Sequence, residues 1–427
     1  MRKLFVFAAL VFALHTNAQN LNNDEKKILA TIHESLPQHL KLLQQMVDIN
    51  SGSLNVKGVR ATGDVLGKAF DGINFKTEWI AMPDSVKRAG HLVASTKGKK
   101  GKKLFLIGHL DTVFEPDMPA NPYKQLNDST VTGQGVSDMK GGDVVIFAAL
   151  HALYKNGLLD DATITAYFTG DEEKTGKPDI ISRGDFIERA KQHDIALGFE
   201  GANGLHTIAT ARRGYSDWKL KVYGEQAHSS GVFRTGYGAI YEAARIINEF
   251  RTQLGNEKYL TFNPGLIIGG TEISHDSANI TARVASKINI ISPACIVQGD
   301  LRFLTVAQKD SAKQRMLRIV NSNNLKGTRA TIDFRDGMPS MEPTKGNDAL
   351  VAVLNKVSLD LGYGEVKAGD PGSRGAGDIS YVAKYLDAID GLGVEGKGEH
   401  APGETMNLGS FEKLVQRAAL LIYRLTR

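Results

Sequence analysis

An apolar run that ends in a histidine and an aspartate constrains the fold of this 427-residue chain more than any other stretch. Residues 104–107 read Leu-Phe-Leu-Ile, and Gly108, His109, Leu110 and Asp111 follow. Such a continuous apolar run is typical of a strand buried on both faces in a parallel sheet. Ligands bind beyond the carboxyl ends of such strands, so His109 and Asp111 are candidate site residues. The pair alone fits a structural role equally well, and other parts of the chain must supply partners.

The bulk composition is that of an ordinary globular protein. Hydrophobic residues make up 42% and charged residues 23% of the chain, and the length favours two or three domains of about 150 residues. The net charge of +5 is small, which favours neither nucleic acid nor an anionic membrane as a partner. A basic run at residues 97–103 contains two glycines and lies between two predicted strands. It therefore favours an exposed hairpin turn over phosphate or nucleic-acid binding.

Residues 1–18 read as a secretory signal peptide. Arg2 and Lys3 precede an apolar run at residues 4–14, and small residues before Ala18 indicate cleavage after it. The run is shorter than the roughly 20 residues that span a bilayer. No cysteine lies near the cleavage point, which disfavours a lipid anchor. We therefore expect a secreted or periplasmic protein with no stable membrane insertion. Its single cysteine, Cys295, excludes an intrachain disulfide.

Helical periodicity and a change of strand pattern divide the mature chain into segments. A helix is predicted over residues 22–50, with Pro37 expected to break or kink it. Strand and helix patterns between residues 213 and 331 follow the order βαββαβ, which is that of the ferredoxin-like motif. We expect a mixed, largely parallel α/β sheet flanked by helices, with a ferredoxin-like α+β lid or dimerisation domain inserted into it. The predicted domains are catalytic segments at 19–212 and 332–427 and a lid at 213–331.

Carboxylates or a histidine also follow other predicted strands. They are Asp171, Glu172 and Glu173 after residues 162–168, Glu200 after residues 194–199, and His400 after residues 388–394. Consecutive carboxylates at the end of a buried strand repel one another, and a cation relieves that repulsion. Asp138 lies in a glycine-rich turn before a predicted helix, without the spacing of a dinucleotide or phosphate loop. The recurrence predicts a metal site at one edge of the sheet.

This ligand set contains imidazoles and carboxylates but no thiolate, which suits zinc, cobalt or manganese. One bridging aspartate, with two further ligands for each of two ions, describes a two-metal hydrolytic centre. Such a centre binds a shared water, lowers its pKa and polarises a carbonyl. One carboxylate must stay free to take the proton and pass it to the leaving amine. Because adjacent side chains point in different directions, Glu172 and Glu173 can divide these roles.

Taken together, these motifs resemble the dinuclear zinc metallopeptidases typified by glutamate carboxypeptidase (carboxypeptidase G), aminoacylase and succinyl-diaminopimelate desuccinylase. The resemblance covers essentially the whole mature chain. It rests on Gly-His-Leu-Asp-Thr-Val at 108–113, Ser-Asp-Met-Lys-Gly-Gly at 137–142, Gly-Asp-Glu-Glu at 170–173, Glu200, Ala-His-Ser-Ser at 227–230 and His400.

The resemblance implies a metal ligand set of five residues and two zinc ions. Asp138 would bridge the two ions. His109 and Glu200 would complete one site, and Glu173 and His400 would complete the other.

The resemblance also implies three catalytic roles outside the ligand set. Asp111 would orient His109, and Glu172 would be the general base. His228 would help to stabilise the tetrahedral oxyanion from the lid, in dimeric members from the partner subunit. From its sequence context alone, His228 reads as a surface loop residue.

The resemblance bears on the substrate as well. In this family, glutamate rather than aspartate at the position of Glu200 is associated with carboxypeptidases and deacylases. Their substrates carry a carboxylate that an arginine can bind bidentately. Arg302, with Asn279 beside it, and Arg374 are the candidates, although a surface or structural role fits each nearly as well.

We therefore expect a secreted hydrolase acting on a small peptide or an N-acyl amino acid, homodimeric through its lid. An aminopeptidase or dipeptidase with the same two-metal centre is the alternative. A non-catalytic binding protein of this fold would lack a ligand or the base, and none is missing here.

Overall fold

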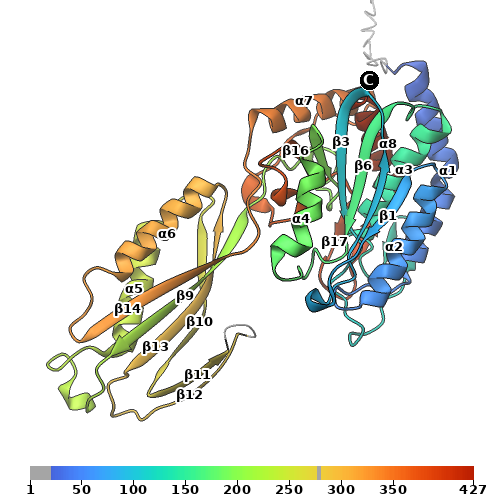
Figure 1. Cartoon of the computed structure of the whole chain (residues 1–427). Helices are drawn as coiled ribbons and strands as arrows, with labels where there is room; N and C mark the ends of the chain where they lie inside the picture. Colours follow the sequence, from blue (N-terminus) through green and yellow to red (C-terminus); the bar gives the residue numbers. More distant parts are fainter. Residues whose placement is uncertain (1–20, 277–279) are drawn as a thin grey trace, which may run out of the picture.

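The computed structural model describes residues 21–276 and 280–427 and divides into two domains (Figure 1). The predicted signal peptide at residues 1–18 and Asn279 lie outside the described residues. Among the described residues, no helix combines the length and the apolar character that crossing a membrane requires.

The catalytic domain is built on a six-stranded sheet in the order β1-β2-β6-β3-β7-β16. β3 pairs in parallel with β6 and β7, and β16 pairs in parallel with β7, whereas β2 runs antiparallel to β1 and β6. The expected mixed, largely parallel sheet is therefore confirmed. The strands are β1 (Lys76–Ile80), β2 (His91–Thr96), β3 (Lys100–His109), β6 (Ala162–Thr169), β7 (Ile195–Gly198) and β16 (Asp387–Ile389).

β3 is buried on both faces, as its apolar run predicts. Leu104 and Leu106 join the core under one layer of helices, and Phe105 and Ile107 join the core on the opposite face. Figure 1 shows α4 on one side of the sheet and α1, α2, α3 and α8 on the other. The catalytic helices are α1 (Asn23–Val47), α2 (Val56–Asp71), α3 (Lys140–Lys155), α4 (Asp179–Ala190), α7 (Lys345–Asp360) and α8 (Leu408–Leu425).

Two local predictions need correction. α1 is not broken at Pro37, because burial of Ile32, Leu43 and Met46 in the main core outweighs one missing backbone hydrogen bond. The basic segment at residues 97–103 is no hairpin turn, because β6 lies between β2 and β3 in the sheet.

The lid domain is a second sheet with its own core. Its strands lie in the order β10-β13-β9-β14, all antiparallel, which confirms the predicted βαββαβ arrangement. β14 ends at Asp336, so this sheet continues past residue 331, where the sequence places the end of the lid. The lid elements are β9 (Gly214–Gly224), α5 (Gly238–Leu254), β10 (Thr261–Gly270), β13 (Ala294–Phe303), α6 (Val306–Val320), β14 (Thr328–Asp336) and the unpredicted hairpin β11 (Glu272–Asp276) and β12 (Thr281–Ala285).

A small four-stranded sheet, in the order β17-β18-β5-β4, joins two distant parts of the chain. Antiparallel pairing of β18 with β5 brings the segment after His400 beside the segment before Asp138. The remaining elements are β4 (Lys124–Asn127), β5 (Thr130–Thr132), β8 (Thr207–Ile208), β15 (Lys367–Ala368), β17 (Gly396–Lys397), β18 (Thr405–Asn407) and the 3-10 turns η1 (Asp84–Val86), η2 (Ser229–Gly231), η3 (Pro371–Ser373) and η4 (Asp378–Tyr381).

Candidate metal centre

The five predicted metal ligands come together at the carboxyl edge of the catalytic sheet. They form two groups that share Asp138, one with His109 and Glu200 and the other with Glu173 and His400. Within each group, one ligand atom from every residue lies within 4.8 Å of the others. A carboxylate has two oxygens, so a residue common to both groups can bridge two ions.

In the first group His109 is buried, whereas Asp138 and Glu200 are partly exposed. The Nε2 atom of His109 lies 3.2 Å from Oδ1 of Asp138 and 3.7 Å from Oε1 of Glu200. Its Nδ1 atom lies 3.0 Å from the main-chain carbonyl oxygen of Asp111. Because a carbonyl can only accept, Nδ1 carries a proton, and this bond turns Nε2 toward the carboxylates, where it could bind a metal ion.

The second group opens to solvent. The Nε2 atom of His400 lies 3.1 Å from Oδ2 of Asp138 and 3.3 Å from Oε2 of Glu173. The side chain of His400 is 60% exposed, against 2% for His109. A substrate can therefore approach the centre from the side of His400.

Asp111 organises the loop that carries the two glutamates. Its carboxylate accepts the backbone N–H groups of Glu172 at 2.9 Å and Glu173 at 3.1 Å, and the Ser53 hydroxyl at 2.6 Å. The same carboxylate stays 3.6 Å from Nδ1 of His109. The main-chain carbonyl of Asp111 orients the imidazole, and its side chain fixes the direction in which Glu172 and Glu173 leave the loop.

The electrostatics of the centre fit bound cations. Burial, together with the nearby carboxylate of Asp138, raises the pKa of Glu200 to about 8. Hydrogen bonds to Asp138 and Glu173 raise the pKa of His400 to about 11. Without metal ions, bound protons therefore offset the repulsion among these crowded carboxylates. Divalent ions bound to the same nitrogen and oxygen atoms would offset that repulsion more completely.

Glu172 lies beside these groups without belonging to either. Burial and the neighbouring carboxylates of Glu200 and Asp378 raise its pKa well above the ordinary value. A carboxyl group with a raised pKa can hold a proton between two transfer steps, as a general base and acid requires.

Two buried arginines behind the centre were not predicted from the sequence. Arg183 donates to Asp378 at 2.8 Å and also bonds Asp171, directly before Glu172. Arg212 bonds Asp390, whose carboxylate accepts the backbone N–H of Glu200 at 3.4 Å. The consecutive acids at 171–173 indicate that positive charge must lie nearby. The sequence does not show that these two arginines supply it, because no local pattern marks them.

The predicted substrate residues are not all at the centre. Arg374 donates to the carbonyl of Gly201 at 2.6 Å and so borders the residue next to Glu200. Arg302 lies on β13 in the lid, where it bonds Asp300 at 2.8 Å. Asn279, the third candidate, lies outside the described residues.

His228 lies at the end of the lid remote from the metal centre. It follows β9, which starts at Gly214 beside the connection to the catalytic domain and extends for about 3.3 Å per residue. The Nδ1 atom of His228 accepts the backbone N–H of Ser230 at 3.2 Å. Within residues 21–276 and 280–427, no hydrogen bond or ion pair joins it to a metal ligand.

Two imidazole–carboxylate pairs around a shared carboxylate, with a free glutamate beside them, define the site of a two-metal hydrolase. The profile of peptidase family M20/M25/M40 matches residues 105–424. The chain therefore belongs to this family of metal-dependent hydrolases, as the sequence motifs indicate.

Individual relatives are similar over most of the chain. Carboxypeptidase G2 from Pseudomonas sp. (strain RS-16) is 25% identical over 400 residues, covering 90% of this chain and 89% of that protein. Succinyl-diaminopimelate desuccinylase from Gluconacetobacter diazotrophicus is 23% identical over 373 residues, covering 84% and 91%. The structure of aminopeptidase PepT from Bacillus cereus matches with a TM-score of 0.73 at 18% identity, covering 91% of this chain and 98% of that one. That last likeness concerns the fold alone.

Proposed function

We propose that this protein is a zinc-dependent carboxypeptidase or N-acyl amino acid deacylase. It would cleave the peptide or amide bond next to a C-terminal amino acid in a small substrate. The observation that carries the proposal is Glu172, a free carboxyl group beside two ligand groups that share Asp138. The identity of Glu200 and the likeness to carboxypeptidase G2 support the substrate class.

The chain's own residues divide the work at the reacting bond. Asp138, His109 and Glu200 would hold one ion, and Asp138 with Glu173 and His400 the other. When bound, the two ions would acidify water and polarise the scissile carbonyl. Glu172 would take a proton from the attacking water and deliver it to the leaving nitrogen. Asp111 would keep Glu172 aimed through its bond to the Glu172 N–H.

We propose that the free carboxylate of the substrate meets Arg374. This guanidinium uses one nitrogen for the Gly201 carbonyl and keeps other N–H groups available. Arg302, already bonded to Asp300, would reach a substrate only by movement of the lid.

An aminopeptidase or dipeptidase with the same centre is the second candidate, and aminopeptidase PepT, a protein of similar fold, is an example of that activity. Matched pairs of N-acetylated and N-free dipeptides, assayed with zinc- and cobalt-loaded enzyme, separate the two. We expect cleavage of the N-blocked members. Strict dependence on a free amino group would overturn the carboxypeptidase and deacylase assignment.

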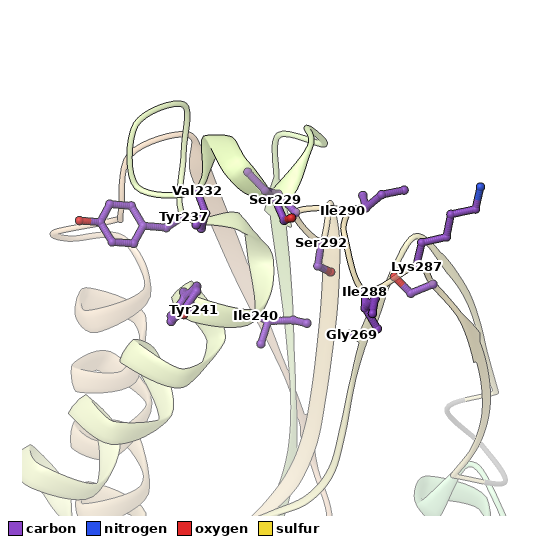
Figure 2. A pocket seen from close by; sticks show the side chains of 12 residues that line it. Ser229, Val232, Tyr237, Ile240, Tyr241, Gly269, Lys287, Ile288, Ile290 and Ser292 are labelled. Carbon is purple, nitrogen blue, oxygen red and sulfur yellow. The ribbon is translucent and has the colours of Figure 1, made fainter.

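We propose that a second copy of the chain covers the outer surface of the lid. A pocket of about 540 Å³ lies there between α5 and the segment after β12, lined by Ile240, Tyr241, Ile288 and Ser229 (Figure 2). Ile240, Tyr241 and Ile288 are exposed, and apolar side chains gathered in this way mark contact surfaces. His228 directly precedes Ser229, so this contact could carry it to the partner's centre. Analytical ultracentrifugation should show a dimer for the wild type and a monomer for Tyr241→Asp.

We also propose that the protein is exported. Its first residues read as a signal peptide with cleavage after Ala18. The purified protein, expressed from the full coding sequence in a host with a secretion system, should begin at Gln19 by mass spectrometry. Retention of Met1 would contradict export by this route.

A further inference from the structure

We infer that Glu404 is a positioning residue that holds the loop of Asp138 and thereby sets the affinity of the metal centre. Its side chain is fully buried. One carboxylate oxygen accepts the backbone N–H groups of Ser137 at 2.7 Å and Asp138 at 2.8 Å, and the Ser137 hydroxyl at 3.0 Å. The other oxygen accepts the backbone N–H of Gly135 at 3.0 Å.

Four donors therefore converge on one carboxylate. Successive backbone N–H groups that point at one spot form an anion-binding concavity, and hydrogen bonds to a charged acceptor are strong. Because the N–H of Asp138 is one of these donors, the bond restrains the backbone from which the shared metal ligand extends. Glu404 acts on the metal centre through Asp138, since it belongs to neither ligand group.

Glu404 also ties the two loops of the second ligand group to each other. It follows His400 in the same turn, where its N–H bonds the carbonyl of Ala401 at 3.1 Å. Its own carbonyl accepts the Thr132 hydroxyl at 2.6 Å, at the point where β18 pairs with β5. A single residue thus links the segment that carries His400 with the segment that carries Asp138.

The chemistry of the contacts requires a carboxylate rather than an amide. An amide in place of the carboxylate would turn an NH2 group toward one of the backbone N–H donors. In Glu404→Gln the loop must then shift or leave a buried donor without an acceptor, although the side-chain volume is unchanged. Loss of an outer partner of a metal ligand lowers metal affinity about 10- to 100-fold.

Zinc titration of the full-length apo enzyme against a chromophoric chelator tests this inference, together with thermal unfolding of each apo protein. Glu404→Gln should weaken binding of at least one zinc ion by about 10- to 100-fold. The matched control is Glu242→Gln in the lid, where another buried carboxylate accepts a backbone N–H, that of Leu325 at 3.0 Å. This control should lose stability and keep the wild-type zinc affinity.

The inference rests on the proposed two-metal centre, and the titration separates the two claims. A wild type that binds no zinc would refute the proposed function itself. A wild type that binds two ions, alongside a Glu404→Gln protein of equal affinity, would refute only the role of Glu404. Should Glu404→Gln not fold, Ser137→Ala removes one donor and leaves the backbone contacts. It should weaken zinc binding in the same direction by a smaller factor, and unchanged affinity would again overturn the inference.

Discussion

The metal centre and the lid differ in how completely one chain builds them. In the catalytic domain, ligands from distant segments converge, and main-chain contacts hold His109 and the Asp138 loop in place. In the lid, His228 is exposed and lies far from the centre, and Arg302 is occupied by Asp300. The contrast indicates that one chain brings the candidate metal ligands together by itself, whereas the proposed role of His228 would require lid movement or a partner subunit.

The largest effect should come from the general base. Glu172→Ala should lower turnover by about 10²- to 10⁴-fold while both ions stay bound, since Glu172 belongs to neither ligand group. Steady-state kinetics with metal analysis of the same sample measures both quantities. The exposed Glu188 on α4 gives the control Glu188→Ala. Unchanged turnover in Glu172→Ala would remove this residue as the general base.

The lid should contribute the next largest effect. His228→Ala should lower turnover by about 10²- to 10³-fold, the scale of a lost oxyanion donor. Equal mixing of His228→Ala with Glu172→Ala should restore about a quarter of wild-type activity, because half of the dimers are mixed and each holds one complete site. No recovery in heterodimers that demonstrably form would mean that one chain builds the whole site.

Buried groups of the catalytic domain should also make its stability depend on pH. Burial, with the neighbouring His151, lowers the pKa of His39 from 6.5 to about 4. Between pH 6.5 and 4, His39 is therefore protonated in the unfolded chain but remains neutral in the folded chain. Stability should be full above pH 6.5 and fall by about 3 kcal/mol as the pH drops to 4.

Chemical denaturation at several pH values, with His39→Gln beside the wild type, measures this dependence. The variant should show a flatter decline, and part of the slope should persist because burial lowers the pKa of His151 too. His33→Gln, on the exposed side of the same helix, is the control for removing a histidine from α1. Equal slopes in wild type and His39→Gln would contradict the assignment.

The smallest expected effect comes from Arg374, the proposed partner of the substrate carboxylate. Arg374→Ala should lower kcat/KM about tenfold for substrates with a free carboxylate, the loss expected for one charged hydrogen bond. The corresponding C-terminal amides should be affected little. Equal losses for acids and amides would show that Arg374 acts only through its bond to the Gly201 carbonyl.

The sequence anticipates that the candidate ligands lie together, because four of the five carry the same local signal. His109, Glu173, Glu200 and His400 each follow an apolar strand pattern, and parallel strands bring such ends to one edge. The alternation of apolar and charged residues from Trp218 onward likewise predicts a strand of the lid sheet with one face in the core. Where periodicity is strong, the fold follows from it.

Features that depend on long-range pairing escape this kind of prediction. Arg183 and Asp378 show no local pattern, because only the packed fold brings them together. Residues 97–103 look like a hairpin turn because nothing nearby reveals that β6 inserts between the flanking strands. Pro37 is an ordinary helix breaker locally, and only the tertiary core explains why α1 continues through it.

The most direct test of the central claim, a two-metal centre bridged by Asp138 within one chain, is calorimetric titration of the apo enzyme with zinc. The account predicts two ions per chain for the wild type. It predicts weaker binding of both ions in Asp138→Asn, since the shared ligand is lost to each site. A wild type that takes up one ion or none, or an Asp138→Asn protein that binds two ions as tightly, would contradict it.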